Sequence, residues 1–316
     1  AAKESCLINL CEVVNMRYIS DEKFIHAFTP SLSPIVTIDD GEAVTVHTVD
    51  CYCNVLKADN DPWLELRKRV PGPNPATGPI EVKGAMPGDT LAVEILDIRP
   101  IEFGMMNVRP GVGSLGEFVK DCVTKRFEVK DGKIDFFGRT IDAVPMIGVI
   151  GAATAPADGE IDTETPHKHG GNMDDRHITA GSTVYLPVRQ AGAMLALGDV
   201  HALMGDGEVG ICGLECAAEV DLKCHVIHGV CEDWPVVRDA QGCYRVNCSA
   251  EDLDAAAYLA RVNLLKFLKR RIHTLTNDQL IMLMSLAGDL EIAQIVDPLV
   301  TCRMGIRPGY LPELEF

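Results

Sequence analysis

Residues 43–49 read Ala-Val-Thr-Val-His-Thr-Val, and this pattern indicates the fold class. Apolar and polar side chains alternate along it with a period of two, and Asp-Asp-Gly at residues 39–41 offers a turn before it. Alternation of this kind is typical of a strand that buries one face and leaves the other in solvent. The stretch therefore predicts a β-sheet packed over a core.

Strand signals of the same kind recur outward from this stretch. Gly-Asp-Thr at residues 88–90 and Gly-Ser-Thr at residues 181–183 each lead into an apolar run, which hints at a duplicated β unit. Residues 71–79 are rich in proline, which cannot donate to a strand ladder, so they predict an ordered, irregular loop. The predicted strands are residues 43–49, 90–95, 183–188, 193–197, 208–212 and 217–227.

The C-terminal part of the chain changes to a helical pattern. Ser249, with Asp252 three residues later, resembles a capping box, and apolar residues at helical spacing follow. Thr276 with Gln279 starts a second helix, which is expected to end at Gly288.

We therefore expect an α+β, β-rich fold: duplicated β units, sandwich-like or barrel-like, with a few helices packed on them and helices at the C-terminus. Residues 1–145 are expected to form an N-terminal β-rich unit and residues 146–248 a second one that carries the main site motifs. Residues 249–316 are expected to form a helical C-terminal region, and the three parts can also make one compact domain.

The composition excludes several classes of protein. Of 316 residues, 47% are hydrophobic, which is enough for a sizeable core. Lys and Arg number 29 against 46 Asp and Glu, a net charge of −17, so no nucleic-acid partner is expected. We find neither a run long enough to span a bilayer nor a signal peptide, and expect a cytoplasmic protein with no membrane partner. The 12 cysteines are expected to be reduced.

The residues able to do chemistry concentrate between residues 167 and 215. In an extended segment, side chains spaced i, i+2 point to the same face and offer two ligands in one direction. An imidazole with carboxylates suits Zn²⁺, whereas an all-oxygen set suits Ca²⁺ or Mg²⁺. Three pairs have this spacing: His167/His169, Asp199/His201 and Asp206/Glu208.

Each of these signals also has a simpler interpretation. Asp206 precedes a glycine, and Asp-Gly read alone is a common hairpin turn. His167 is expected to be solvated, and Asp174 can be an ordinary polar residue of a loop. Asp50 is either an ordinary residue of a strand end or a further ligand. It is the concentration of such residues in one segment that favours a site.

Six motifs follow one another along the chain. They are Thr-Val-Asp-Cys (48–51), Asn-Pro-Ala-Thr-Gly-Pro-Ile (74–80), Gly-Ala-Met-Pro-Gly-Asp-Thr-Leu (84–91), Met-Ile-Gly-Val-Ile-Gly (146–151), His-Gly-Gly-Asn-Met-Asp (169–174) and Gly-Asp-Val-His-Ala-Leu-Met-Gly-Asp-Gly-Glu (198–208). Together they resemble the acetamidase/formamidase family, and the last block is long and specific. The resemblance covers about residues 37–226 and does not fix which amide is cut.

The resemblance implies a hydrolase that cuts short aliphatic amides such as formamide and acetamide and releases ammonia. It also implies a duplicated β-rich fold, metal ions and oligomers. Amide hydrolysis needs an activated water, stabilisation of the oxyanion and a proton for the departing amine. A metal ion supplies the first two. We expect a divalent metal, Zn²⁺ first and Ca²⁺ as the alternative, and a homodimer or higher homo-oligomer.

Under this hypothesis the candidate residues take three roles. The metal-ligand candidates are His201, Asp199, Asp50 and His169, with His201 the strongest. The general base and proton shuttle is Glu208, followed by Asp206 and Asp174. Asn172, with the backbone of Gly170 and Gly171, is expected to bind the amide.

Three alternatives stay open. Cys51 can be the nucleophile of a cysteine-dependent amidase, in which case alkylation abolishes activity and chelation does not. The chain can also be a non-catalytic metal-binding or assembly protein of the same fold. Finally, the substrate can be a larger or cyclic amide.

Overall fold

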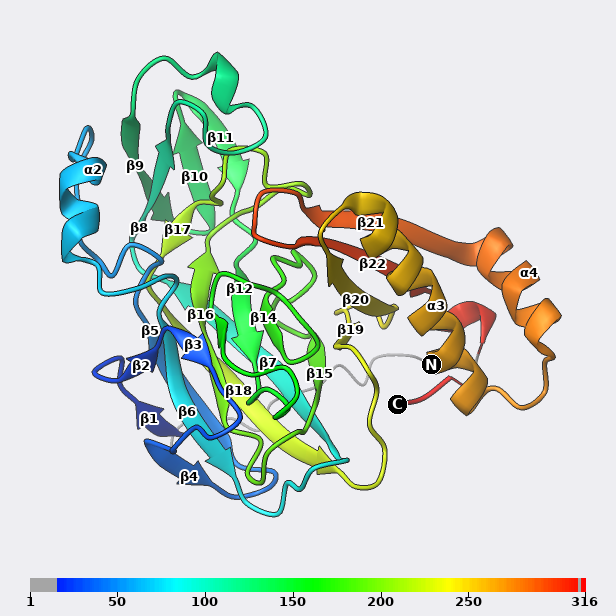
Figure 1. The fold of residues 1–316 in the computed structure, drawn as a ribbon. Coiled ribbons are helices and arrows are strands. Elements are labelled where there is room, and N and C mark those ends of the chain that lie inside the picture. Colours follow the sequence, from blue (N-terminus) through cyan, green and yellow to red (C-terminus); the bar gives the residue numbers. More distant parts are fainter. Residues whose placement is uncertain (1–15, 312–313) are drawn as a thin grey trace.

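The computed structural model describes residues 16–311 and 314–316, and β-strands are the predominant regular elements among them (Figure 1). One sheet has nine strands. Their order is β1 (Arg17–Ile19), β5 (Ala43–Thr48), β18 (Ala218–Ile227), β7 (Thr90–Pro100), β15 (Thr183–Pro187), β19 (Val236–Arg238), β20 (Tyr244–Ala250), β22 (Val300–Ile306) and β21 (Gly288–Gln294).

The second sheet has eleven strands. Its main path is β11 (Arg139–Asp142), β10 (Lys133–Phe136), β9 (Val123–Lys130), β8 (Phe103–Val108), β17 (Glu215–Cys216), β16 (Leu195–His201), β12 (Met146–Gly151) and β14 (Gly170–Asn172). β6 (Ala76–Val82) pairs with β16 and carries β2 (Phe24–Ile25) and β4 (Val36–Ile38). A separate ladder joins β3 (Ala27–Phe28) to β13 (Ile161–Asp162).

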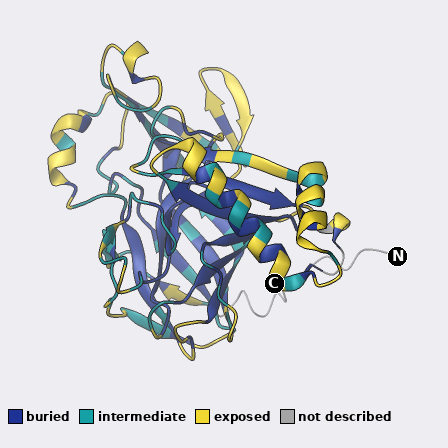
Figure 2. Ribbon diagram, turned by 45° about the vertical axis from the view of Figure 1, so that its right-hand side comes forward, coloured by how far each residue is buried: buried dark blue, intermediate teal, exposed yellow. Residues whose placement is uncertain are grey.

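Burial along the strands follows the pattern of apolar and polar residues in the sequence. Along β5 every second residue is buried, so the expected alternation is confirmed for residues 43–48 and ends at residue 49, which is also buried. Val44 and Val46 of this strand join Ile147 and Ile150 of β12 in the largest apolar cluster. All residues of β12 and β16 are buried. Figure 2 shows that buried strands fill the interior of the molecule, and the side chains on β16 lie in such a water-poor setting.

Two longer helices pack on the end of the nine-stranded sheet. α3 (Leu253–Arg271) lies over β20 and β22, where Leu264 and Phe267 belong to the same apolar cluster as Val246 and Met304. α4 (Asn277–Ala287) begins at the capping box of Thr276 and is capped by Gly288, as the sequence predicts. The short elements are α2 (Trp63–Leu66), η1 (Arg67–Arg69), η2 (Gly116–Phe118) and η3 (Pro308–Tyr310).

The expected α+β, β-rich fold is confirmed, with three differences in detail. Both large sheets mix strands from before and after residue 145, so that boundary separates no sheet from another. The C-terminal region, expected to be helical, also contributes β21 and β22. Ser249 lies in β20, and Asp252 alone caps α3 by accepting a hydrogen bond from the amide of Ala255.

Two segments were expected in the wrong local conformation. Residues 76–79, expected in an irregular loop, belong to β6, and its register against β16 shifts across Gly78 and Pro79. The ladder thereby skips the residues least suited to it. Residues 208–212, expected as a strand, turn instead, because Glu208 and Ile211 have positive φ angles of 45° and 79°.

Two expectations about the whole chain can be compared with the described residues. Within them, no helix has the length and apolar character needed to cross a membrane. Every cysteine in the described ranges is unpaired. The absence of disulfides there agrees with the expectation of reduced, mostly buried thiols.

Candidate functional site

A cavity of about 490 Å³ lies where the eleven-stranded sheet meets several loops. Its wall includes Asp199 from β16 and Glu215 from β17. Cys51 from the loop after β5 and Trp63 from α2 lie on the same wall. Asp297, from the loop between β21 and β22, completes it. Segments far apart in the sequence therefore converge on one space.

Carboxyl groups crowd around one buried imidazole beside this cavity. His201 Nε2 lies 3.1 Å from Glu215 Oε1, 3.7 Å from Asp199 Oδ1 and 4.0 Å from Asp174 Oδ1. His201 and Asp174 are fully buried, and Asp199 and Glu215 are nearly so. Glu208, 7% exposed, belongs to the same group. We call Asp174, Asp199, His201, Glu208 and Glu215 the acid–histidine cluster.

The electrostatics of the cluster show an excess of negative charge. Burial raises the pKa of Asp174 to about 6 and that of Glu215 to about 8, and Asp199 adds to both shifts. Burial and the neighbouring Asp174 raise the pKa of Glu208 well above its ordinary value. Burial alone would lower the pKa of His201, but Glu215 and Asp199 raise it well above its usual value. One imidazolium cannot balance so many buried carboxylates.

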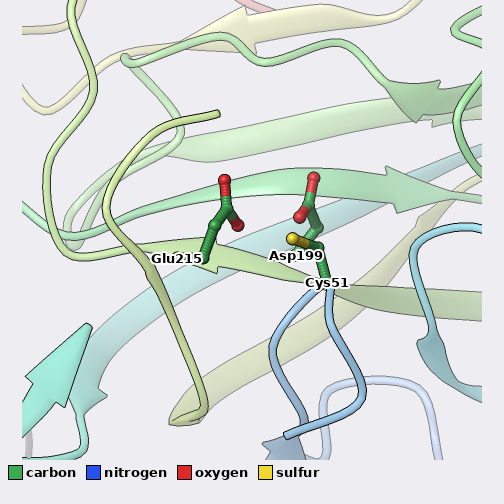
Figure 3. A group of neighbouring side chains, drawn as sticks. All are labelled: Cys51, Asp199 and Glu215. Carbon is green, nitrogen blue, oxygen red and sulfur yellow. The ribbon is translucent and has the colours of Figure 1, made fainter. Parts of the chain in front are cut away.

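The donor atoms fit a divalent cation. Asp174, His201 and Glu208 each offer one ligand atom, with all three atoms within 4.8 Å of one another. Cys51, Asp199 and Glu215, drawn in Figure 3, form a second such group. Both carboxylate oxygens of Asp174 and Oε2 of Glu215 are buried without a hydrogen-bond donor. Buried acceptors without donors are costly, and a cation would satisfy them.

The backbone supports the cluster in a strained conformation. Asp174, Asp199 and Glu208 have positive φ angles of 45°, 54° and 45°. Non-glycine residues rarely adopt this region, and such strain is typical of functional sites. Gly148 leaves the necessary space, since a Cβ there would lie 2.5 Å from Asp174 Oδ1 and 2.7 Å from Asp199 Oδ2.

Arg303 on β22 fixes two loops that carry cluster residues. Its side chain is fully buried, and Nη1 lies 3.3 Å from Oδ1 of Asp175, the neighbour of Asp174. Nη2 donates to both carboxylate oxygens of Asp206 at 2.8 and 2.7 Å, and Nε donates to Glu291 at 2.8 Å. The guanidinium thus holds the segment of Asp174 and the turn that leads to Glu208.

Gln294 plays a similar part for the loop between β21 and β22. Its Oε1 accepts hydrogen bonds from the amides of Val296 at 2.9 Å and Asp297 at 3.1 Å. Asp297 in turn accepts a hydrogen bond from Asn172 Nδ2 at 2.9 Å. Burial and the charges of Asp174 and Glu208 raise the pKa of Asp297 well above its ordinary value.

The structure brings several predicted residues together. His201, Asp199, Glu208 and Asp174 lie in the acid–histidine cluster, and Asn172 lines the cavity. Asp206 does not join them, because both of its oxygens are bound by Arg303. Asp206 therefore faces Arg303 and not the cavity because of a contact between residues that are 97 positions apart in the sequence.

Four other predicted residues lie outside the cluster. The ring of His169 packs on Phe28 with centroids 4.6 Å apart, and burial lowers its pKa to about 3. Asp50 accepts a hydrogen bond from the amide of Asn54 at 2.6 Å, and burial raises its pKa to about 6. Gly170 and Gly171 pair with β12 in the ladder, so they serve close strand packing there.

Sequence reasoning did not select three residues of the wall. Glu215 stands in a run of small and apolar residues, where the sequence alone fits either a site role or a solvated face, although a carboxylate in such a run is a usable signal. Asp297 and Arg109 lie in segments without a motif, and only tertiary structure brings them to the cavity. Cys51, the alternative nucleophile, does lie on the wall.

Known proteins resemble this chain over most of its length. The sequence profile of the Acetamidase/Formamidase family matches residues 15–162 and 155–307. An acetamidase from Mycolicibacterium smegmatis is 30% identical over 51% of this chain and 55% of its own length. A formamidase from Methylophilus methylotrophus is 27% identical over 66% of this chain and 65% of its own. The chain thus spans less than two thirds of these curated relatives.

A solved structure extends the similarity to nearly the whole chain. The crystal structure of an acetamidase from Bacillus halodurans superimposes with a TM-score of 0.89 at 39% sequence identity. The match covers 95% of this chain and 100% of that one.

The substitution Glu291→Gln tests the ion pairs around Arg303. Burial alone would raise the pKa of Glu291, but hydrogen bonds from His177 and Arg303 lower it well below its ordinary value of 4.5. A carboxyl group whose pKa is lower in the folded state stabilises the protein above its unfolded-state pKa. This stabilisation is lost as the pH falls towards the folded-state pKa. The variant should lose about 3 kcal/mol of unfolding free energy at neutral pH, and the difference should shrink in acid.

Urea unfolding of both proteins between neutral and acidic pH measures this difference. Glu117→Gln, at an exposed position, is the matched control and should unfold like the parent at every pH. A Glu291→Gln penalty that stays constant with pH would contradict the ion-pair account.

Proposed function

The chain belongs to the acetamidase/formamidase family, and we propose that it hydrolyses short aliphatic amides, such as formamide and acetamide, to the carboxylate and ammonia with a bound divalent metal ion. The acid–histidine cluster carries this proposal. Its buried carboxylates exceed the charge of His201 and lie beside a cavity large enough for an amide. Such a cluster is stable only when a cation or protons offset the negative charge.

The residues suited to hold the ion are Asp174, His201 and Glu208. One nitrogen and two oxygen donors suit Zn²⁺, and Ca²⁺ is the alternative if more oxygens join. When bound, such an ion polarises an amide carbonyl and lowers the pKa of a water molecule. Glu208, selected from the sequence as general base, is assigned to the ion here because it shares the group of Asp174 and His201.

Two side-chain amides on the cavity wall are suited to bind the substrate. Asn74 Nδ2 donates to Asp199 Oδ2 at 3.0 Å and to Asn172 Oδ1 at 3.4 Å. Asn172 donates to Asp297 at 2.9 Å. These bonds fix both amide groups, and a substrate carboxamide can exchange hydrogen bonds with the free donor and acceptor positions that remain.

Glu215 is the residue that we assign to proton transfer. It lines the cavity, its Oε1 lies 3.1 Å from His201 Nε2, and its Oε2 has no donor. A buried carboxyl group with an oxygen free of donors can accept a proton from water and deliver it to the departing amine. Hydrolysis needs both transfers, because an amine leaves an amide only after protonation.

The cysteine alternative has less support from the surroundings of Cys51. Burial and the charges of Glu215 and Asp199 raise the pKa of its thiol well above the ordinary value. The thiolate is the nucleophilic form, so these neighbours oppose the role that a cysteine amidase requires. The same thiol is suited to lie beside a cation with Asp199 and Glu215.

Ammonia release from formamide, acetamide and propionamide tests the proposed function. Chelation should abolish turnover and zinc should restore it, because chelation removes the positive ion that Asp174 and His201 are proposed to hold. The Cys51→Ala variant should keep measurable zinc-dependent turnover. Turnover that survives chelation and disappears in Cys51→Ala would replace the metal account with the cysteine account.

A pair of isosteric variants separates ion binding from proton transfer. Asp174→Asn removes a charge from the ion group and should lower both zinc content and turnover at least 100-fold. Glu215→Gln should retain zinc but lose about 100-fold in kcat, since the amide cannot carry the proton. Metal analysis beside steady-state kinetics measures both effects. Normal kcat in Glu215→Gln would remove Glu215 from the reaction.

A further inference from the structure

The cavity is much larger than the amides proposed above. Its volume is about 490 Å³, and cavities of roughly 300–1,000 Å³ hold drug-sized ligands. Acetamide has only four non-hydrogen atoms, so it leaves most of this space unfilled. A substrate that filled the cavity would carry a further group beyond the scissile amide.

Part of the cavity wall differs chemically from the acid–histidine cluster. Trp63, Arg67, Arg109 and Glu164 line the same cavity as the carboxylates of the cluster. Burial, Asp162 and Asp199 raise the pKa of Glu164, whereas Arg67 and Arg109 act to lower it. Arg67 and Arg109 are the cations among the described lining residues, and their guanidinium groups set their part of the wall apart from the carboxylates.

The Arg109 side chain has an unsatisfied hydrogen-bond donor. Its Nε is buried without an acceptor, and no carboxylate of residues 16–311 and 314–316 lies within ion-pair distance of its guanidinium. The guanidinium instead lies over the indole of Trp63, with Cζ 5.8 Å from the ring centroid. A cation–π contact of this kind orients an arginine but satisfies none of its hydrogen-bond donors.

Trp63 also has a buried hydrogen-bond donor without an acceptor. It lines the cavity, and its Nε1 is buried without an acceptor. Buried donors are almost always paired in folded proteins, and an unpaired one costs stability. Two such donors beside one cavity, one of them on a cation, call for an anionic ligand group with several acceptor oxygens.

We propose that the substrate is an amide bearing a carboxylate, and that Arg109, oriented by Trp63, binds this carboxylate while the amide group faces the acid–histidine cluster. The inference rests on the proposed amide hydrolysis and adds the substrate class to it. A planar guanidinium matches a carboxylate geometrically and remains charged at every working pH. The charge also distinguishes such substrates from neutral amides of the same size.

Succinamate and its neutral isostere levulinamide test the inference. Both have a carboxamide at one end, and they differ in a terminal carboxylate against a methyl ketone. In the zinc-supplied wild-type protein, kcat/KM for succinamate should exceed that for levulinamide at least tenfold. Arg109→Met should reduce this ratio at least tenfold, chiefly through a higher KM for succinamate, and Arg109→Lys should restore part of it.

Arg139→Met is the matched control, because Arg139 is exposed on β11 and absent from the cavity wall. It should leave the ratio unchanged. A wild-type ratio near one, or a ratio that Arg109→Met does not change, would overturn the inference while leaving amide hydrolysis standing.

A calorimetric titration with succinate separates this inference from the proposed function. If no amide is hydrolysed, the proposed function fails, and the titration still decides the binding claim. Succinate binding that weakens at least tenfold in Arg109→Met supports the carboxylate site. Equal binding to both proteins, or no binding to either, overturns it.

Discussion

One buried guanidinium, that of Arg303, holds the parts of the site in place. Burying a charge costs several kcal/mol unless partners surround it, and Arg303 has carboxylates on three sides, from Asp175, Asp206 and Glu291. Asp175 precedes the turn after β14 and Asp206 lies in the loop after β16, so a strand near the C-terminus fixes the loops that carry Asp174 and Glu208. These ion pairs act against the mutual repulsion of the carboxylates in the acid–histidine cluster.

The cluster itself opposes folding in the absence of a cation. Buried carboxylates near one another raise each other's pKa, and three of them stand on backbone with positive φ. The repulsion and the backbone strain therefore lower the stability of one small region within a large, well-packed pair of sheets. A catalytic metal site has these properties, because the charges that repel without the ion are those that bind it. The glycine at position 148 completes the arrangement by leaving room for Asp174 and Asp199.

Sequence reasoning succeeds where a local pattern determines the structure and fails where a distant contact decides. The alternation of residues 43–49 predicts β5 because one strand face must be buried. Gly78 and Pro79 disfavour a strand locally, so the sequence does not predict β6. The shifted register against β16 accommodates them in the sheet. His201 belongs to a dense motif and is found, whereas Asp297 belongs to none. The local sequence around Asp206 cannot reveal that Arg303, 97 residues later, binds it.

The most direct measurement is anomalous diffraction from crystals of the protein grown with zinc, recorded on both sides of the zinc absorption edge. The account predicts a zinc peak at roughly 2.0–2.2 Å from the side chains of Asp174, His201 and Glu208. Crystals of active protein with no anomalous peak in the acid–histidine cluster would contradict the account.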